Sequence, residues 1–182
     1  MKKKELILKV TDQLQLMILH PEDVKAKYVD WLNDSSIMGM TEQVHAIHTI
    51  ESTKKYVSEC YDNPLVYFFG IFHKNNHIGN IKIGPVNSNH ATADIAYVIG
   101  DKEYWGQGIA TKVIESVLNF GFNRLGLWKI SAGVYENNIG SIKALTKNNM
   151  NIEGEFIEEV SFEGKRLNTY RLGVLKKDFY QE

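Results

Sequence analysis

The segment Tyr104-Trp105-Gly106-Gln107-Gly108-Ile109-Ala110-Thr111 carries two closely spaced glycines between a strand-like run and a helix-like run. The first turn of a helix offers backbone N–H groups that have no acceptor within the helix, and the helix dipole makes this end electropositive. Glycines at positions 106 and 108 would let the backbone approach anionic oxygens closely. The segment therefore predicts either a phosphate site or a tight turn between strand and helix.

The residues after the glycines predict a helix, because apolar side chains recur there with the spacing of one helix face at Ala110, Val113, Ile114, Val117, Leu118 and Gly121. The residues before the glycines predict an antiparallel meander, with strand-like runs at 66–72, 78–83 and 91–99. A meander does not match the βαβ start of a dinucleotide-binding fold, whose third glycine position is here Thr111. No Gly-Lys-Ser/Thr follows, so a P-loop is excluded.

Further elements are predicted on both sides of this region. Before it, the patterns indicate one or two strands within 5–20, a helix after Pro21, and a helix that Thr49 caps. After it, they indicate a strand at 128–135, a helix at 138–149, and a hairpin of strands 152–162 and 167–175. We expect an α/β fold: a mixed, mostly antiparallel central sheet flanked by helices, with a C-terminal β-hairpin.

Composition indicates one compact domain over residues 1–182, with 43% hydrophobic residues and 3 prolines. The formal net charge is −1, so no overall field favours nucleic acid or an anionic membrane as a partner. Cys60 is the single cysteine, which leaves no intrachain disulfide and no Cys-rich zinc site. Charged residues interrupt the segment after the basic start, and no long apolar run follows, so we expect a cytoplasmic protein without export signal or membrane helix.

Three segments together resemble the GNAT N-acetyltransferase superfamily: the strand 93–99, the loop 105–110 and the later run Asn137-Asn138-Ile139-Gly140-Ser141. More narrowly, the chain resembles the branch that contains ribosomal-protein amino-terminal acetyltransferases and spermidine acetyltransferases. The family loop reads Q/R-x-x-G-x-G/A, which this chain matches at Gly108 and Ala110. Trp105 stands where the family has Gln or Arg.

The resemblance implies acetyl-CoA as the acetyl donor. Its pyrophosphate would bind the loop and first helical turn, formed by Trp105, Gly106, Gln107, Gly108, Ile109, Ala110 and Thr111. Its pantetheine arm would lie like an extra strand between the strands 91–99 and 128–135, held by backbone groups of Tyr97, Val98 and Ile99. Asn138 matches an asparagine whose side chain contacts this arm, and it could equally cap the following helix.

The resemblance also names candidate catalytic residues. The tyrosine that many relatives use to protonate the departing thiolate is replaced by Leu145, so Ser141 becomes the candidate acid, unless the thiolate leaves unaided. Asp94 matches the catalytic glutamate of histone acetyltransferases in the superfamily and is the candidate base, acting through a water. Glu136 and Tyr135 are weaker candidates, and a solvated strand residue is the alternative for Asp94.

Two histidine pairs, His45/His48 and His73/His77, have spacings that could hold a metal, but neither has a third ligand nearby. We expect solvent-facing or capping histidines and no metal cofactor. The aromatic run 67–72 reads as core rather than as an RNA-stacking surface, since it has no basic companions.

The resemblance implies direct acetyl transfer from acetyl-CoA to the primary amine of a small molecule, such as an amino-sugar or polyamine, or of a protein amino terminus. Acceptor contacts would come from the two early helices, the loop 39–48 and the terminal hairpin. The alternative is a non-catalytic acyl-CoA-binding regulatory or scaffolding module. The sequence does not decide between a monomer and a homodimer.

Overall fold

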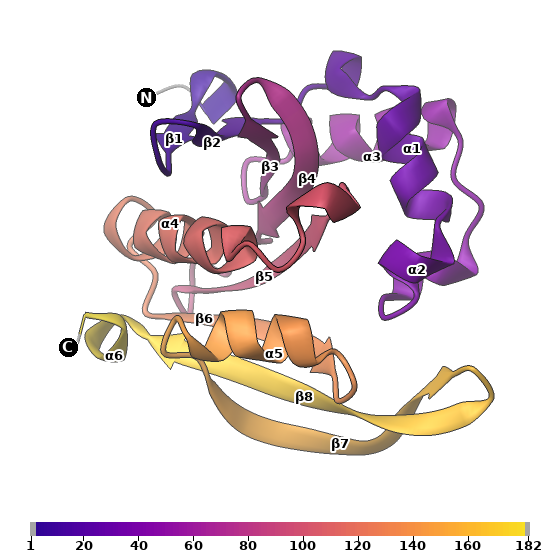
Figure 1. Cartoon of the computed structure of the whole chain (residues 1–182). Helices are drawn as coiled ribbons and strands as arrows, with labels where there is room; N and C mark the ends of the chain where they lie inside the picture. The colour runs from indigo at the N-terminus through magenta and orange to yellow at the C-terminus, as the bar shows by residue number, and fades with distance from the viewer. Residues whose placement is uncertain (1–2, 181–182) are drawn as a thin grey trace.

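The computed structural model describes residues 3–180 and is built around an eight-stranded sheet of order β1-β2-β3-β4-β5-β6-β8-β7 (Figure 1). The strands are β1 (Ile7–Lys9), β2 (Leu14–Ile18), β3 (Tyr67–His73), β4 (Asn76–Ile83), β5 (Thr92–Ile99), β6 (Lys129–Tyr135), β7 (Asn151–Phe162) and β8 (Lys165–Leu175). The helices are α1 (Ala26–Asn33), α2 (Ser35–Met38), α3 (Ile50–Asp62), α4 (Ile109–Asn123), α5 (Ile139–Thr146) and α6 (Lys176–Phe179). Short 3-10 turns are η1 (Lys3–Glu5), η2 (Pro21–Asp23), η3 (Glu42–His45) and η4 (Lys102–Tyr104).

All neighbouring strands pair antiparallel except β5 and β6, which run parallel because α4 connects them. The mixed, mostly antiparallel sheet with a terminal β7–β8 hairpin confirms the predicted fold class. The early strands, the meander, the capped helix α3 and the long helix α4 all lie where the sequence predicts them.

Two hydrophobic cores lie on opposite faces of the sheet, as the neighbouring residues Phe68 and Phe69 of β3 illustrate. Successive side chains of a strand point to opposite faces, and Phe69 belongs to the core under α4 and α5. Phe68 instead joins the core formed with α1 and α3. The same alternation in β5 sends Tyr97 to the α4 and α5 face and Val98 to the other.

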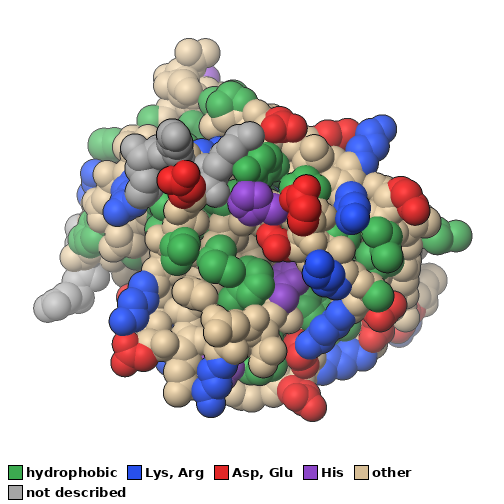
Figure 2. Space-filling view, turned by 90° about the horizontal axis from the view of Figure 1, so that it is seen from above, with side chains coloured by type: hydrophobic (Ala, Val, Ile, Leu, Met, Phe, Trp, Pro, Cys, Tyr) green, Lys and Arg blue, Asp and Glu red, His purple; other side chains and the backbone are tan. Residues whose placement is uncertain are grey.

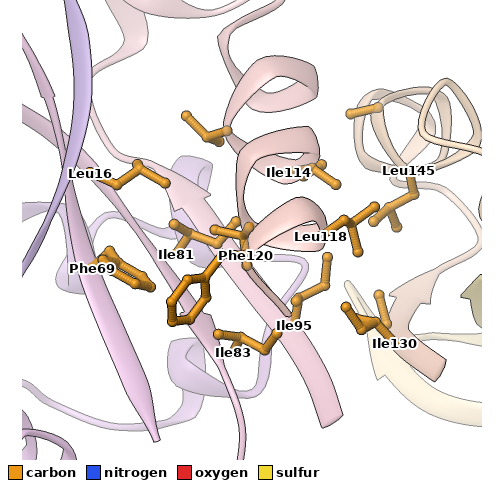
Figure 3. Packing of buried hydrophobic residues seen from close by; sticks show 14 of the residues in the cluster. Leu16, Phe69, Ile81, Ile83, Ile95, Ile114, Leu118, Phe120, Ile130 and Leu145 are labelled. Carbon is orange, nitrogen blue, oxygen red and sulfur yellow. The ribbon is translucent and has the colours of Figure 1, made fainter. Parts of the chain in front are cut away.

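Helix α4 fills the centre of the larger core. Its apolar stripe is fully buried at Val113, Ile114, Val117 and Leu118. Figure 3 shows Leu118 between the strands and Leu145 of α5, with Ile95 of β5 and Ile130 of β6 close by. This shared packing holds α4 and α5 beside the strands β5 and β6.

One short helix was not predicted. The segment 33–36 reads as a break after α1, yet α2 begins immediately at Ser35. The Asp34 side chain accepts a hydrogen bond from Ser36 N and so caps α2 while ending α1. A polar run can thus both stop one helix and start the next.

The surface carries charges of both signs. Figure 2 shows Lys and Arg side chains interspersed with Asp and Glu over the face seen from above. Within residues 3–180, no helix is both long enough and apolar enough to cross a membrane.

Candidate active site

The strands β5 and β6 pair only at their beginning and then separate. Their parallel register covers Thr92 with Lys129, Ala93 with Ile130 and Asp94 with Ser131. Beyond these pairs β5 continues to Ile99 and β6 to Tyr135 with no further pairing between them. The strands therefore leave an opening within the sheet, which we call the β5–β6 opening.

Backbone groups of β5 face this opening at alternate residues. Asp94 O accepts from Gly84 N, which follows β4, and Gly100 N donates to Ile78 O of β4. Even-numbered residues of β5 thus direct their backbone groups to β4, and odd-numbered residues direct theirs away from it. Tyr97 consequently presents both of its backbone groups to the opening and Ile99 presents its N–H, since Ile99 O already accepts a hydrogen bond from Trp105 Nε1. The backbone groups of Val98 turn toward β4.

The glycine turn, residues 105–108, follows the end of β5 that has separated from β6. Gly106 and Gly108 have φ of +73° and +72°, the left-handed region that favours glycine. A Cβ added to either glycine would meet no atom within 4 Å, so this side of the turn is open. Gly108 is the N-cap of α4, whose first N–H groups have no acceptor within the helix. The turn therefore combines open space with free donors, as a bound phosphate requires.

Trp105 fastens this turn to β5. Its indole Nε1 donates a hydrogen bond of 2.7 Å to Ile99 O. Gln107 Nε2 donates to Glu103 O at 2.6 Å and so tightens the turn further. The tryptophan at the family's Gln/Arg position thus anchors the glycine turn to the strand beside the β5–β6 opening.

A pair of hydroxyl groups joins β5 to α5 on the α4 and α5 face. The hydroxyl oxygens of Tyr97 and Ser141 lie 2.7 Å apart. Asn138 Oδ1 accepts from Ser141 N at 3.1 Å and caps α5, which matches the capping alternative for this asparagine. Burial raises the pKa of the Tyr97 hydroxyl, so this phenol stays protonated at neutral pH.

The neighbouring Asn137 was not singled out from the sequence. Its side-chain Oδ1 is buried and has no hydrogen-bond partner within the described part of the chain. It directly follows the end of β6 and precedes the α5 cap. An unsatisfied buried acceptor is unusual in a folded protein, and it makes Asn137 a candidate for a ligand contact.

Leu145, in contrast, lies away from solvent. Its side chain is fully buried in the core with α4. This position therefore contributes packing, and the hydroxyl nearest to the opening on α5 is that of Ser141.

The opposite face of the sheet carries ionised groups. Asp94 lies where β5 and β6 begin to separate, and its Oδ1 accepts from Arg171 Nη2 of β8. Both side chains are about half-exposed. The predicted base thus stands at the edge of the β5–β6 opening as one partner of an ion pair.

Two glutamates approach the far end of β6 on this face. Tyr135 donates its hydroxyl to Glu42 Oε1 of η3 at 2.5 Å, and Thr169 of β8 donates to Glu159 of β7. Burial, followed by the hydrogen bond to Glu42 and the charges of Glu42 and Glu159, raises the pKa of Tyr135. Glu136 instead accepts from Asn168 N, a backbone contact to the hairpin.

Sequence reasoning expected solvent-facing or capping histidines, and His77 departs from this. Its ring stacks on Phe72 with centroids 5.1 Å apart and meets the Trp31 ring edge-on at 5.2 Å. Burial lowers the pKa of His77. Among the described residues, no group of His, Cys, Asp and Glu could hold a metal ion.

The family model of the acetyltransferase (GNAT) domain matches residues 13–151. The chain belongs to the GNAT acetyltransferase family. A probable N-acetyltransferase of Bacillus subtilis, YjcK, is 31% identical over 138 residues, which cover 72% of this chain and 75% of that protein. The chain spans 57% of the length of another relative, the uncharacterized N-acetyltransferase p20 of Bacillus licheniformis, at 28% identity.

Solved structures share the whole GNAT fold. The spermidine N-acetyltransferase from Vibrio cholerae, in complex with CoA and spermine, superposes with a TM-score of 0.83 at 21% identity and covers 94% of this chain and 100% of that one. RimL, a ribosomal L7/L12 alpha-N-protein acetyltransferase in complex with CoA, has a TM-score of 0.84 at 17% identity over 93% and 98% of the two chains. Both kinds of enzyme in the branch that the sequence resembles, the ribosomal-protein and the spermidine acetyltransferases, are therefore structural neighbours of this chain.

Proposed function

We propose that this GNAT protein transfers the acetyl group of acetyl-CoA directly to the primary amine of a cationic acceptor. The β5–β6 opening is the observation that carries the proposal. An unpaired stretch of parallel strands exposes backbone donors and acceptors with the spacing of an extended chain, and a pantetheine arm has amides to match them. The glycine turn at the end of the same strand supports a diphosphate site at the correct end of that arm.

In this proposal the loop from Trp105 to Thr111 binds the pyrophosphate, and the backbone of Tyr97 and Ile99 pairs with the pantetheine arm. Val98 would contribute through its side chain's packing, since its backbone groups turn toward β4. Asn137 and Asn138 stand at the other side of the opening, with the buried acceptor of Asn137 available to a pantetheine amide.

The proposed reaction uses side chains from both faces of the sheet. An alkylammonium must first lose a proton, for which the carboxylate of Asp94 is the proposed base, acting through a water. The amine nitrogen then attacks the thioester carbon, the C–S bond breaks, and its electron pair goes to sulfur. A second proton leaves the new amide nitrogen for solvent, and Ser141 hydrogen-bonds to the departing thiolate.

The face of the sheet that carries Asp94 and Tyr135 favours a positively charged substrate. Glu42 and Glu159 lie near the Tyr135 hydroxyl, and Arg171 forms an ion pair with Asp94. Gly39, at the end of α2, lies beside the Phe162 ring of the hairpin, so the early helices and the hairpin frame this face together. A polyamine carries several ammonium groups and fits such a surface better than a neutral amino-sugar does.

The proposal is tested with a panel of primary amines, measuring thiol release from acetyl-CoA. The panel includes spermidine, spermine, an aminoglycoside, glucosamine and peptides with free amino termini. We expect turnover with at least one polyamine. Thermal stabilisation by acetyl-CoA without thiol release from any amine would instead favour a non-catalytic acyl-CoA-binding module.

A further inference from the structure

The contact between Tyr97 and Ser141 joins two elements that the sequence keeps 44 residues apart. Tyr97 comes from the part of β5 that has already separated from β6, and Ser141 comes from the first turn of α5. Their hydroxyl pair therefore links the separated part of β5 to α5 on the α4 and α5 face of the sheet. This side of the opening carries neutral hydroxyls, whereas the opposite side carries carboxylates.

A serine hydroxyl has one hydrogen and two lone pairs, so its partner decides which way the hydrogen points. If Ser141 donated to Tyr97, its hydrogen would be unavailable to a sulfur atom. If Tyr97 donates, the Ser141 hydrogen is free to turn toward the opening. The raised pKa keeps the phenol protonated, and Asn138 Oδ1 is occupied by Ser141 N, which leaves the hydroxyl unclaimed by the cap.

We propose that Tyr97 is a positioning residue that donates its hydroxyl hydrogen to Ser141 Oγ and thereby turns the Ser141 hydrogen toward the departing thiolate of CoA. The inference rests on the proposed acetyl transfer. No proton leaves either hydroxyl: the thiolate takes the electron pair of the broken C–S bond and accepts a hydrogen bond from Ser141. The hydrogen bond that Tyr97 donates polarises the Ser141 hydroxyl and so strengthens the hydrogen bond from Ser141 to the thiolate.

The first test is a cycle of Tyr97→Phe, Ser141→Ala and the double variant, with single-turnover rates at saturating acetyl-CoA. We expect about a 10²-fold loss for Ser141→Ala, as for one lost hydrogen bond to developing charge, and about a tenfold loss for Tyr97→Phe. Adding Tyr97→Phe to Ser141→Ala should cost nothing more, and the CoA dissociation constant should stay within about twofold in all variants. Tyr67→Phe is the matched control, since Tyr67 is also a half-buried tyrosine packed on the same core.

The second test does not need turnover. In Ser141→Cys, the thiolate absorbs in the ultraviolet, and its titration reports any hydrogen bond that Tyr97 donates. The signal of the matching protein without Ser141→Cys, wild type or Tyr97→Phe, is subtracted to remove Cys60 and the tyrosines. We expect the thiol introduced by Ser141→Cys to titrate about one pH unit lower with Tyr97 present than in the double variant Tyr97→Phe/Ser141→Cys. This result would support the positioning role even if no amine in the panel reacts.

Several outcomes would overturn the inference. One is the same thiol pKa in the two variants that carry Ser141→Cys. Another is a wild-type single-turnover rate in Tyr97→Phe, or a Ser141→Ala rate within about threefold of wild type. The last is a rate loss from Tyr97→Phe that is the same with and without Ser141. A tenfold loss that Tyr67→Phe reproduces would assign the effect to packing.

Discussion

The two faces of the β5–β6 opening differ in charge, and the difference matches two opposite chemical demands. On the α4 and α5 face stand the neutral hydroxyls of Tyr97 and Ser141. On the opposite face stand Asp94 with Arg171, and Glu42 and Glu159 near Tyr135. A departing thiolate is stabilised by neutral donors and repelled by carboxylates, whereas an ammonium acceptor is attracted by carboxylates. Separate faces allow both conditions within one opening.

The strongest test of this division is Asp94→Asn on the charged face. Removing the proposed general base should lower turnover about 10²-fold, with the greatest loss at low pH where few acceptor amines are neutral. The CoA dissociation constant should hardly change, because Asp94 faces away from Tyr97 and Ser141. Steady-state rates from about pH 6 to 9 and calorimetric titration with CoA measure the two effects.

The matched control for Asp94→Asn is Glu153→Gln, which removes another partly exposed strand carboxylate paired with a cation, Lys129. A wild-type rate and pH profile in Asp94→Asn would make Asp94 a structural partner of Arg171 and transfer the base role to Glu136 or a water chain. Equal losses in both variants would indicate disruption of the sheet.

At the glycine turn, Gly108→Asp should weaken CoA binding at least tenfold, about 1.4 kcal/mol, since it adds a negative charge beside the proposed pyrophosphate site. Gly126→Asp is the control for backbone strain. Gly126 has φ of +69° and, like Gly108, open space around a Cβ, but it lies beyond the far end of α4. Isothermal titration calorimetry measures the dissociation constant of CoA for the two variants. Equal dissociation constants would mean that the phosphate site does not lie at Gly108.

The smallest expected effect concerns Glu42. Glu42→Gln should raise the KM for a polyamine about threefold and leave the KM for a monoamine nearly unchanged, because one favourable charge interaction near the surface is lost. The polyamine effect should shrink in high salt. Glu115→Gln removes an exposed carboxylate from α4, far from the charged face, and should change neither value. An identical KM in Glu42→Gln for every amine would remove Glu42 from acceptor binding.

Local patterns in the sequence predicted all the strands, most of the helices and the glycine turn, because helix periodicity, strand alternation and capping residues act over a few positions. The contacts on which the proposed chemistry depends are long-range: Tyr135 meets Glu42 across 93 positions and Arg171 meets Asp94 across 77. No local spacing encodes such pairs, since they depend on how the hairpin and η3 approach β5 and β6. The bond from Trp105 to Ile99 and the unsatisfied acceptor of Asn137 emerged only from the folded arrangement for the same reason.

A crystal structure of the protein with CoA would test the β5–β6 site itself. We expect the pantetheine arm between β5 and β6, paired with the backbone of Tyr97 and the N–H of Ile99, and the pyrophosphate at the turn containing Gly106 and Gly108. We also expect the CoA sulfur within about 3.5 Å of Ser141 Oγ, a normal distance for a hydrogen bond to sulfur. CoA bound elsewhere, or β5 and β6 paired along their whole length in the complex, would contradict it.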